Sequence, residues 1–359
     1  MSDTSKTRLF DMLHHRSARL AKGDPVPDPL VMSSVFALPE QPEPSRTYGR
    51  GSSPTLEALE QRLAHLEAAP CLSFPSGMGA YAGLLMAALK QGDRVLLLSD
   101  GYYAARNLVS EVLAPFGVQL ATCPADTIAD TDLTGFAMVI IETPSNPGLT
   151  VIDIDALAAR CRTAGAMLAV DNTVCTPLLQ NPLDLGADAV IVSDTKAMGG
   201  HSDLLMGHVA SRNTALMERV QSVRTLMGLN PGPQEAWMLI RGLETLEIRL
   251  ERMCSNARAL LPVLKASPHT SDVTYPEPHP QTSDQGFLIG LRFTDAATAD
   301  RFLELAGFAP TTSFGGLHSS GDRRARWGDD VSGGFLRLSI GIEPTAQLQA
   351  AVSSALSAL

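Results

Sequence analysis

The sequence predicts an α/β protein that combines a mainly parallel sheet with a smaller α+β unit at the C-terminal end. Between about residues 54 and 192, short apolar runs alternate with helical segments, a pattern typical of parallel strands covered by helices on both faces. After about residue 231, one long helical stretch precedes two alternating runs. A chain of 359 residues suffices for roughly two domains. We therefore expect an N-terminal arm over 1–50, an α/β domain over 51–242 and an α+β domain over 243–359.

The first 50 residues combine one helical segment with a proline-rich stretch. Helical periodicity runs from 7 to 22, and prolines follow at positions 25, 27, 29, 39, 42 and 44. Proline fixes φ and lacks an N–H donor, so this stretch predicts an extended arm. Apolar residues at 30–32 and 35–36 favour an arm that lies against another surface over a disordered one.

The α/β region begins with a strongly amphipathic helix over 55–69, where leucines recur at nearly helical spacing. Short apolar runs predict strands at 71–74, 94–98, 136–141, 166–170 and 187–192. Helices are expected between them at 80–89, 105–116 and 154–164. In the C-terminal unit, the pattern predicts one long helix over 233–264 and strands over 286–293 and 335–340. The charged segment 321–330 predicts a solvated helix or loop near the pocket.

Composition excludes several classes of protein. The net charge is −10, so the sequence lacks the basic footprint of a nucleic-acid binder. No apolar run approaches the roughly 20 residues of a membrane span, and the N-terminus shows no apolar signal region. The five cysteines are odd in number and contain no C-x-x-C pair, which indicates reduced thiols rather than disulfides or a zinc site. We expect a cytoplasmic protein that binds neither nucleic acid nor membrane.

Ligands of such sheets bind beyond the carboxyl ends of the strands, so the residues after each strand matter most. The strand at 71–74 is followed by a turn with Gly77 and Gly79, whose backbone N–H groups at a helix start suit an anion. An ordinary tight turn is the alternative interpretation. The same glycines, with Asp100 at the end of the next strand, also resemble a loose dinucleotide fingerprint, which keeps an NAD(P)-binding Rossmann enzyme open.

Three further strand ends favour a different cofactor. Asn146, Asp171 and Lys196 each follow an apolar strand, and Ser193 and Thr195 stand beside the lysine. Pyridoxal 5'-phosphate (PLP) requires a lysine for a Schiff base, an acid for its pyridine nitrogen and a phosphate site, whereas a nicotinamide needs no lysine there. The chain contains few lysines, and Lys196 stands among small residues rather than among charges.

The stretch AVDNTVCTPLLQNPLDLGADAVIVSDTKAMGGHSD, residues 169–203, resembles the signature of the Cys/Met-metabolism family of PLP-dependent enzymes. The family comprises cystathionine γ-synthases, cystathionine γ- and β-lyases and methionine γ-lyases. The resemblance runs from Tyr48 to Arg337. It implies the aspartate aminotransferase-like fold of PLP enzymes (fold type I), with a seven-stranded-type sheet, and a homotetramer that shares active sites between subunits.

The resemblance also implies residue roles. Lys196 would form the Schiff base and carry protons, Asp171 would pair with the pyridine nitrogen, Tyr102 would stack on the ring and Asn146 would bind the ring's 3′-oxygen. The phosphate would be bound by Gly77, Met78, Ser193 and Thr195, and a neighbouring subunit's phosphate by Tyr48 and Arg50.

Arg337 is the candidate for the substrate carboxylate. It stands in an otherwise apolar alternating strand, where a lone guanidinium is costly to bury, and its planar fork suits a carboxylate. A structural salt bridge is the alternative. Ser145 and Ser313 are candidates for the same pocket.

The sequence departs from the family pattern at positions that bear on specificity. Tyr103 follows Tyr102 where the family normally has glycine, and Ala104 stands where methionine γ-lyases usually carry a reactive cysteine. Thr47 and His318 replace acidic residues of relatives. We expect a PLP-dependent C–S lyase of sulfur amino acids, first a cystathionine γ-lyase, then a β-lyase, then a γ-synthase. A family member that only binds PLP or a partner is a further alternative.

Overall fold

The computed structural model describes residues 3–38 and 47–359. These residues form two sheets with helices packed on them. The larger sheet has seven strands in the order β1-β7-β6-β5-β4-β2-β3. Its strands are β1 (Cys71–Phe74), β2 (Arg94–Leu98), β3 (Gln119–Cys123), β4 (Met138–Glu142), β5 (Met167–Asp171), β6 (Ala189–Val192) and β7 (Gly207–Ala210). Only β7 runs antiparallel to its neighbours, β1 and β6. The mainly parallel, seven-stranded α/β architecture is therefore confirmed.

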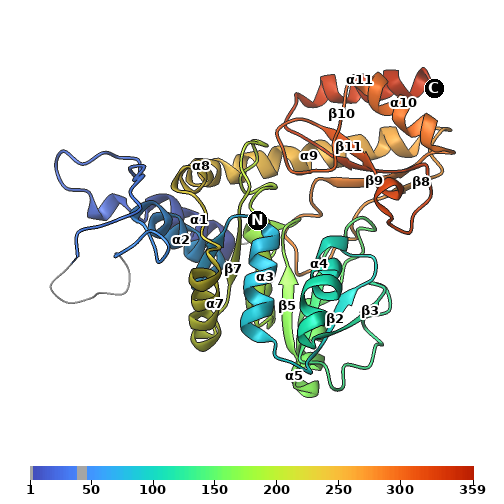
Figure 1. Cartoon of the computed structure of the whole chain (residues 1–359). Coiled ribbons are helices and arrows are strands. Elements are labelled where there is room, and N and C mark those ends of the chain that lie inside the picture. Colours follow the sequence, from blue (N-terminus) through green and yellow to red (C-terminus); the bar gives the residue numbers. More distant parts are fainter. Residues whose placement is uncertain (1–2, 39–46) are drawn as a thin grey trace.

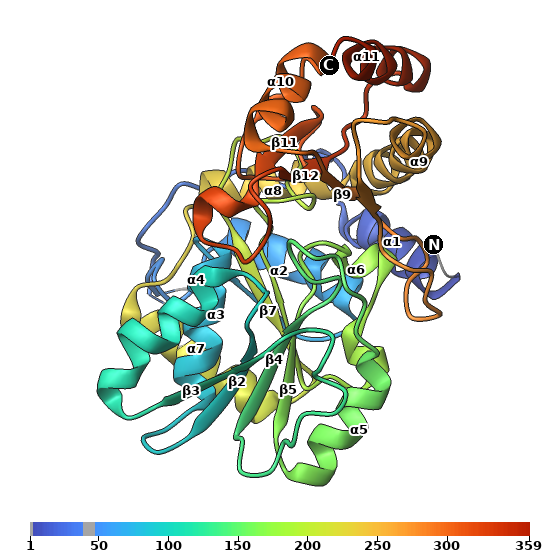
Figure 2. The same ribbon diagram turned by 90° about the vertical axis from the view of Figure 1, so that its right-hand side faces the viewer.

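Helices cover both faces of this sheet (Figure 2). On one face, α3 (Gly77–Ala88) and α7 (Thr214–Met227) pack through one apolar cluster, alongside α4 (Tyr103–Asn107). On the other face, α5 (Ile154–Ala164) packs against the strands through a second cluster. Burial on both faces explains why these strands are almost uniformly apolar. Strands β3 and β7 and helix α7 were not expected from the sequence; β3 is half polar and β7 has only four residues.

Two predicted helices are interrupted. The helix expected over 105–116 is α4, then a π-helical turn over Leu108–Leu113 and a 3₁₀ turn over Ala114–Phe116, which contains Pro115. The helix expected over 233–264 is two helices, α8 (Pro233–Leu243) and α9 (Leu246–Lys265). The break between α8 and α9 falls beside residue 242, where we expect a domain boundary. That boundary stays a prediction.

Arg249 connects the junction between α8 and α9 to the turn after Lys196. Its guanidinium donates at 2.7 Å to the carbonyl of Gly242 in the last turn of α8, which also accepts the Thr245 N–H at 3.2 Å. It also donates to the carbonyls of Ala197 and Met198 at 2.7 and 3.1 Å. One buried side chain thus joins the end of α8 to the turn after Lys196, a tertiary contact that periodicity does not reveal.

The smaller sheet has the order β10-β11-β12-β9-β8 and lies at the C-terminal end (orange to red in Figure 1). Its strands are β8 (Asp272–Thr274), β9 (Leu288–Arg292), β10 (Ala309–Pro310), β11 (Ser320–Arg323) and β12 (Phe335–Ser339). Helices α9, α10 (Ala296–Ala306) and α11 (Thr345–Ser357) pack on it through a shared apolar cluster. This is the smaller α+β unit that the sequence predicts.

The N-terminal segment packs partly on its own chain. Helix α1 (Asp3–His14) ends earlier than the predicted residue 22, and its Leu9 and Met12 are buried against α2 (Pro54–Glu67). Beyond it, Val26, Met32 and Leu38 are exposed on an extended stretch. The prolines at 39, 42 and 44 lie outside the described residues. Within the described ranges, no helix is both long enough and apolar enough to span a membrane.

Candidate active site

A cavity of about 230 Å³ lies at the carboxyl ends of β4, β5 and β6, between the two sheets. Parallel strands bring their carboxyl ends to one edge, so residues far apart in sequence meet there. The cavity walls include most of the candidate residues, namely Gly77, Met78, Tyr102, Asn146, Asp171, Ser193, Thr195, Lys196 and Arg337.

Lys196 is the lysine of this cavity. Its Nζ lies 3.0 Å from Ser313 Oγ and 5.1 Å from the centre of the Phe314 ring. Burial, followed by the positive charges of Arg337 and Arg324, lowers the pKa of Lys196 to about 8. A larger neutral fraction near pH 7 makes the amine a better nucleophile and base.

Asp171 ends β5 and is held on both carboxylate oxygens. The Tyr81 hydroxyl donates to Oδ2 at 2.7 Å, and the Thr173 N–H donates to Oδ1 at 2.9 Å. Burial raises the pKa of Asp171, while these bonds and Lys196 oppose that rise. Glu142 stands opposite Asp171 in the β4–β5 register, and burial and then Asp171 raise its pKa well above the ordinary value. Asp171 is therefore the member of this pair better suited to carry the negative charge.

Sequence reasoning missed two members of this group. Glu142 lines the cavity and accepts a bond from the Tyr102 N–H at 3.1 Å. Its position at a strand end, in register with Asp171, is a signal that strand alignment would provide. Tyr81 lies inside α3, and its contact with Asp171 depends on how the helix packs on the sheet. Nothing in the local sequence marks it.

The start of α3 fits an anionic group such as a phosphate. Ser76 caps the helix by accepting from the Gly79 N–H at 3.0 Å, and the cap leaves the Gly77 and Met78 amides at the cavity wall. A Cβ at position 77 would lie 2.7 Å from Ser193 Cβ, so only glycine fits. Backbone amides at a helix N-terminus, with the Ser193 hydroxyl beside them, are suitable donors for a phosphate.

Arg337 is almost fully buried in β12 and has no carboxylate partner among the described residues. Nη1 donates to Asn146 Oδ1 and Nη2 to the Thr312 carbonyl, both at 2.7 Å, while Nε is buried without a partner. Burial, and next the charge of Arg324, lower the pKa of Arg337 to about 10. This environment does not provide the structural salt bridge that was the alternative. A guanidinium oriented by neutral acceptors is ready for an anion from outside the chain.

Four expected residues do not line the cavity. Tyr48 and Arg50 stand on the arm, with the guanidinium 5.6 Å from the ring centre. Ser145 is buried, and its Oγ accepts from the Thr150 N–H at 3.1 Å, so it shapes a turn. Ser313 is absent from the wall of this cavity, but it reaches the site through its contact with Lys196 Nζ.

The expectation that the charged segment 321–330 is a solvated helix or loop is wrong for its first part. Its first part is strand β11, and Asp322 and Arg324 are both 3% exposed. Their opposite charges pair at 2.9 Å, which makes burial tolerable. Arg324 also lines the cavity with Lys196.

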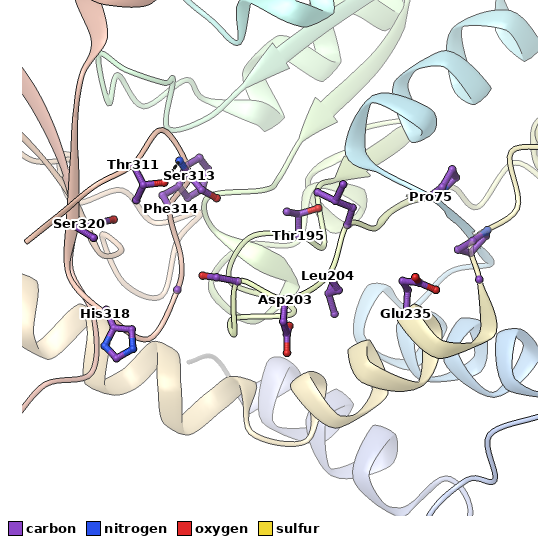
Figure 3. A pocket seen from close by; sticks show the side chains of 16 residues that line it. Pro75, Thr195, Asp203, Leu204, Glu235, Thr311, Ser313, Phe314, His318 and Ser320 are labelled. Carbon is purple, nitrogen blue, oxygen red and sulfur yellow. Dashed lines mark hydrogen bonds between the residues drawn. The ribbon is translucent and has the colours of Figure 1, made fainter.

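A larger cavity of about 790 Å³ adjoins the first and shares Thr195, Leu205 and Phe314 with it. Figure 3 shows His318 and Ser313 on the C-terminal side, with Asp203, Leu204 and Glu235 across from them. His318 therefore faces a cavity that opens toward Lys196, where a long substrate can extend.

Comparison with known proteins agrees with this geometry. The family model described as "Cys/Met metabolism PLP-dependent enzyme" matches residues 12–357. The chain belongs to this family. PLP is accordingly its cofactor, and the glycine-lined helix start, the buried Asp171 and the cavity lysine fit that group. The NAD(P)-binding alternative is wrong: Asp100 accepts a bond from the Ala125 N–H at 2.8 Å and does not line the cavity.

The relatives of this PLP-dependent enzyme carry several names. A Streptomyces coelicolor protein, named as a candidate cystathionine γ-lyase, is 39% identical over 95% of this chain and 92% of its own. An L-methionine γ-lyase from Pseudomonas deceptionensis is 32% identical over the full length of both chains. The crystal structure of cystathionine γ-synthase from Xanthomonas oryzae, in complex with aminoacrylate and cysteine, matches with a TM-score of 0.91 and 30% identity over 98% of this chain and 97% of that one. Other relatives are named cystathionine β-lyases. Similarity alone therefore leaves the particular reaction open.

A buried ionic network supports the loop that carries Lys196. His208 in β7 lies 2.8 Å from Asp194 Oδ1 and 3.2 Å from Glu67 Oε1, and all three side chains are fully buried. Burial opposes the charge on His208, but Asp194 and Glu67 overcome it and raise the pKa of His208 to about 10. Asp194 also accepts the Gly199 N–H through its backbone carbonyl, so the network fixes the turn around the lysine.

We expect the contribution of His208 to the free energy of unfolding to fall as pH rises from about 6.5 to about 10. The pKa of His208 is raised on folding, so its contribution is complete below its ordinary pKa of 6.5 and is lost as pH approaches about 10. The substitution His208→Gln should cost about 3–5 kcal/mol near pH 6.5, because it leaves two buried carboxylates without their cation. Thermal denaturation from pH 6 to 10 checks this: the difference from wild type should shrink with pH, and a constant difference would contradict it.

Proposed function

We propose that this protein is a PLP-dependent C–S lyase that acts as a cystathionine γ-lyase, converting L-cystathionine and water to L-cysteine, 2-oxobutyrate and ammonia. The observation that carries the proposal is the meeting of Lys196, Asp171 and Arg337 in one cavity. The Streptomyces coelicolor relative supports the γ-lyase assignment over its alternatives, cystathionine β-lyase and cystathionine γ-synthase.

PLP, when bound, supplies an electron sink that stabilises negative charge on carbon next to the substrate amine. The phosphate would be held by the Gly77 and Met78 amides with Ser193 and Thr195, and the pyridine nitrogen by Asp171. Tyr102 is partly exposed at the cavity wall and would cover the ring. Asn146, which accepts a hydrogen bond from Arg337, would also bind the ring oxygen.

The protein's own groups then perform the proton transfers. Arg337 orients the substrate carboxylate so that the Cα proton faces Lys196 Nζ. Because the pKa of Lys196 is lowered to about 8, its neutral amine can accept that proton. Lys196 would pass the Cα proton on to the bound cofactor, and its neutral amine could then remove a Cβ proton. The Cγ–S bond breaks with the electron pair on sulfur, and Nζ returns the Cβ proton to that sulfur. Ser313, 3.0 Å from Nζ, keeps the amine directed into the cavity between these transfers.

Identification of the keto acid tests the assignment. Wild-type protein loaded with PLP and given L-cystathionine should release 2-oxobutyrate with L-cysteine, quantified by chromatography of the derivatised keto acids. Predominant pyruvate with homocysteine would instead make the protein a β-lyase. In that case Thr47 and His318, which replace acidic residues, become the positions to exchange first.

The arm belongs to the same proposal. Tyr48 and Arg50 do not reach the cavity of their own chain, and apolar side chains on the arm are exposed. We therefore assign the two residues to the cofactor phosphate of a neighbouring subunit, within a homotetramer. Analytical ultracentrifugation of the holoenzyme measures the assembly directly.

A further inference from the structure

Arg324 is a charged residue that lines the cavity and has no role in the proposed chemistry. It directly follows β11 and is 3% exposed. Its Nη1 donates to Asp322 Oδ2 at 2.9 Å, and its Nε donates to Asp329 Oδ2 at 2.7 Å. The side chains of these two aspartates are 3% and 6% exposed. Two buried carboxylates therefore fix the plane and direction of the guanidinium.

One end of this guanidinium remains free. Nη2 of Arg324 donates to no atom in residues 3–38 and 47–359, whereas Nη1 also approaches Thr312 Oγ1 at 3.4 Å. Because Arg324 lines the cavity, Nη2 is the end that a bound molecule can reach. A guanidinium N–H at the cavity wall that lacks a protein acceptor can form a charge-assisted hydrogen bond with an anionic ligand.

Arg324 and Arg337 lie on either side of Thr312. Arg337 donates to the Thr312 carbonyl, and the β11–β12 register pairs Asp322 with Arg337. Two cations at one end of a 230 Å³ cavity repel each other, which is consistent with the lowering of the Arg337 pKa by Arg324. The substrate α-carboxylate occupies Arg337, so the second guanidinium suits a second anionic group.

We propose that Arg324 is a specificity-determining residue that binds a second carboxylate, carried on the sulfur-bearing arm of the substrate. The enzyme then selects dicarboxylic thioethers such as L-cystathionine over monocarboxylic ones such as L-methionine. This inference rests on the proposed function, since it concerns substrates of the same site. It also explains how Asp322 and Asp329 act as positioning residues, because they hold the fork without occupying Nη2.

The test compares kcat/KM of wild type and Arg324→Gln on three compounds. L-Cystathionine and S-(2-carboxyethyl)-L-homocysteine carry the second carboxylate, and L-methionine lacks it. Loss of a charge-assisted contact should lower kcat/KM roughly 10- to 100-fold for the first two and less than about threefold for methionine. Arg324→Lys keeps the charge and should retain part of the selectivity, which also guards against a folding defect in the glutamine variant. Arg323→Gln is the matched control, because Arg323 bonds Asp300 and does not line the cavity.

A second measurement separates this inference from the proposed function. Calorimetry on PLP-loaded Lys196→Ala protein gives Kd values for the same compounds without turnover, with and without Arg324→Gln. An equal loss for all three compounds, in kcat/KM and in Kd, overturns the inference while the lyase activity stands. If wild type releases no keto acid from any of them, the proposed function fails. The Kd values alone then decide whether Arg324 binds the second carboxylate.

Discussion

Lys196→Ala should remove turnover almost completely, by a factor of at least about 10³–10⁴ in kcat, because the substitution deletes both the proposed covalent anchor of the cofactor and the proposed base. The amine stands in the cavity within 3.0 Å of Ser313. Keto acid release from L-cystathionine is the measurement.

Lys90→Ala is the matched control, because Lys90 is exposed on the surface away from the cavity. It should retain wild-type kcat. The melting temperature of the Lys196 variant should stay close to that of the wild-type apoprotein, which separates lost chemistry from lost folding. Full activity in Lys196→Ala would remove the basis of the proposed mechanism.

Arg337→Ala should raise KM for all amino acid substrates by about 30-fold or more, with a smaller change in kcat. A bidentate contact with a buried guanidinium is worth about 2–5 kcal/mol, and alanine leaves the substrate carboxylate without it. Arg337→Lys should recover only part of the loss, since an ammonium keeps the charge but not the planar fork. Steady-state kinetics of both variants supply the values.

The Arg337 and Arg324 variants should differ in one respect. Loss of Arg337 affects every substrate, because every substrate has an α-carboxylate, whereas loss of Arg324 affects only substrates with a second one. An unchanged KM in Arg337→Ala would show that the α-carboxylate binds elsewhere in the cavity.

Much of the fold follows from local sequence. The apolar strands β1, β2, β4, β5 and β6 are visible as runs of branched and aliphatic residues, because both faces of the sheet are buried. The order of the strands places Asp171 and Lys196 at the same edge, so the core of the candidate site could be anticipated from strand ends. The similarity of residues 169–203 to a known family adds the cofactor.

What the sequence did not reveal depends on contacts between distant segments. At the junction of the two helices within 233–264, Arg249 reaches back to Gly242 and across to Ala197, a contact that local periodicity does not indicate. Arg324 looked solvated because its segment is rich in charge, yet two aspartates neutralise it inside the protein. Local charge patterns do not distinguish a solvated arginine from a compensated buried one.

Reduction of the holoenzyme with borohydride tests the central claim most directly, because it fixes PLP permanently to the lysine that holds it. Proteolysis and mass spectrometry then locate the modified residue among the lysines at positions 6, 22, 90, 196 and 265. The account predicts stoichiometric modification of Lys196 and no modification of the others. Modification of a different lysine, or none in a protein that has bound PLP, would contradict it.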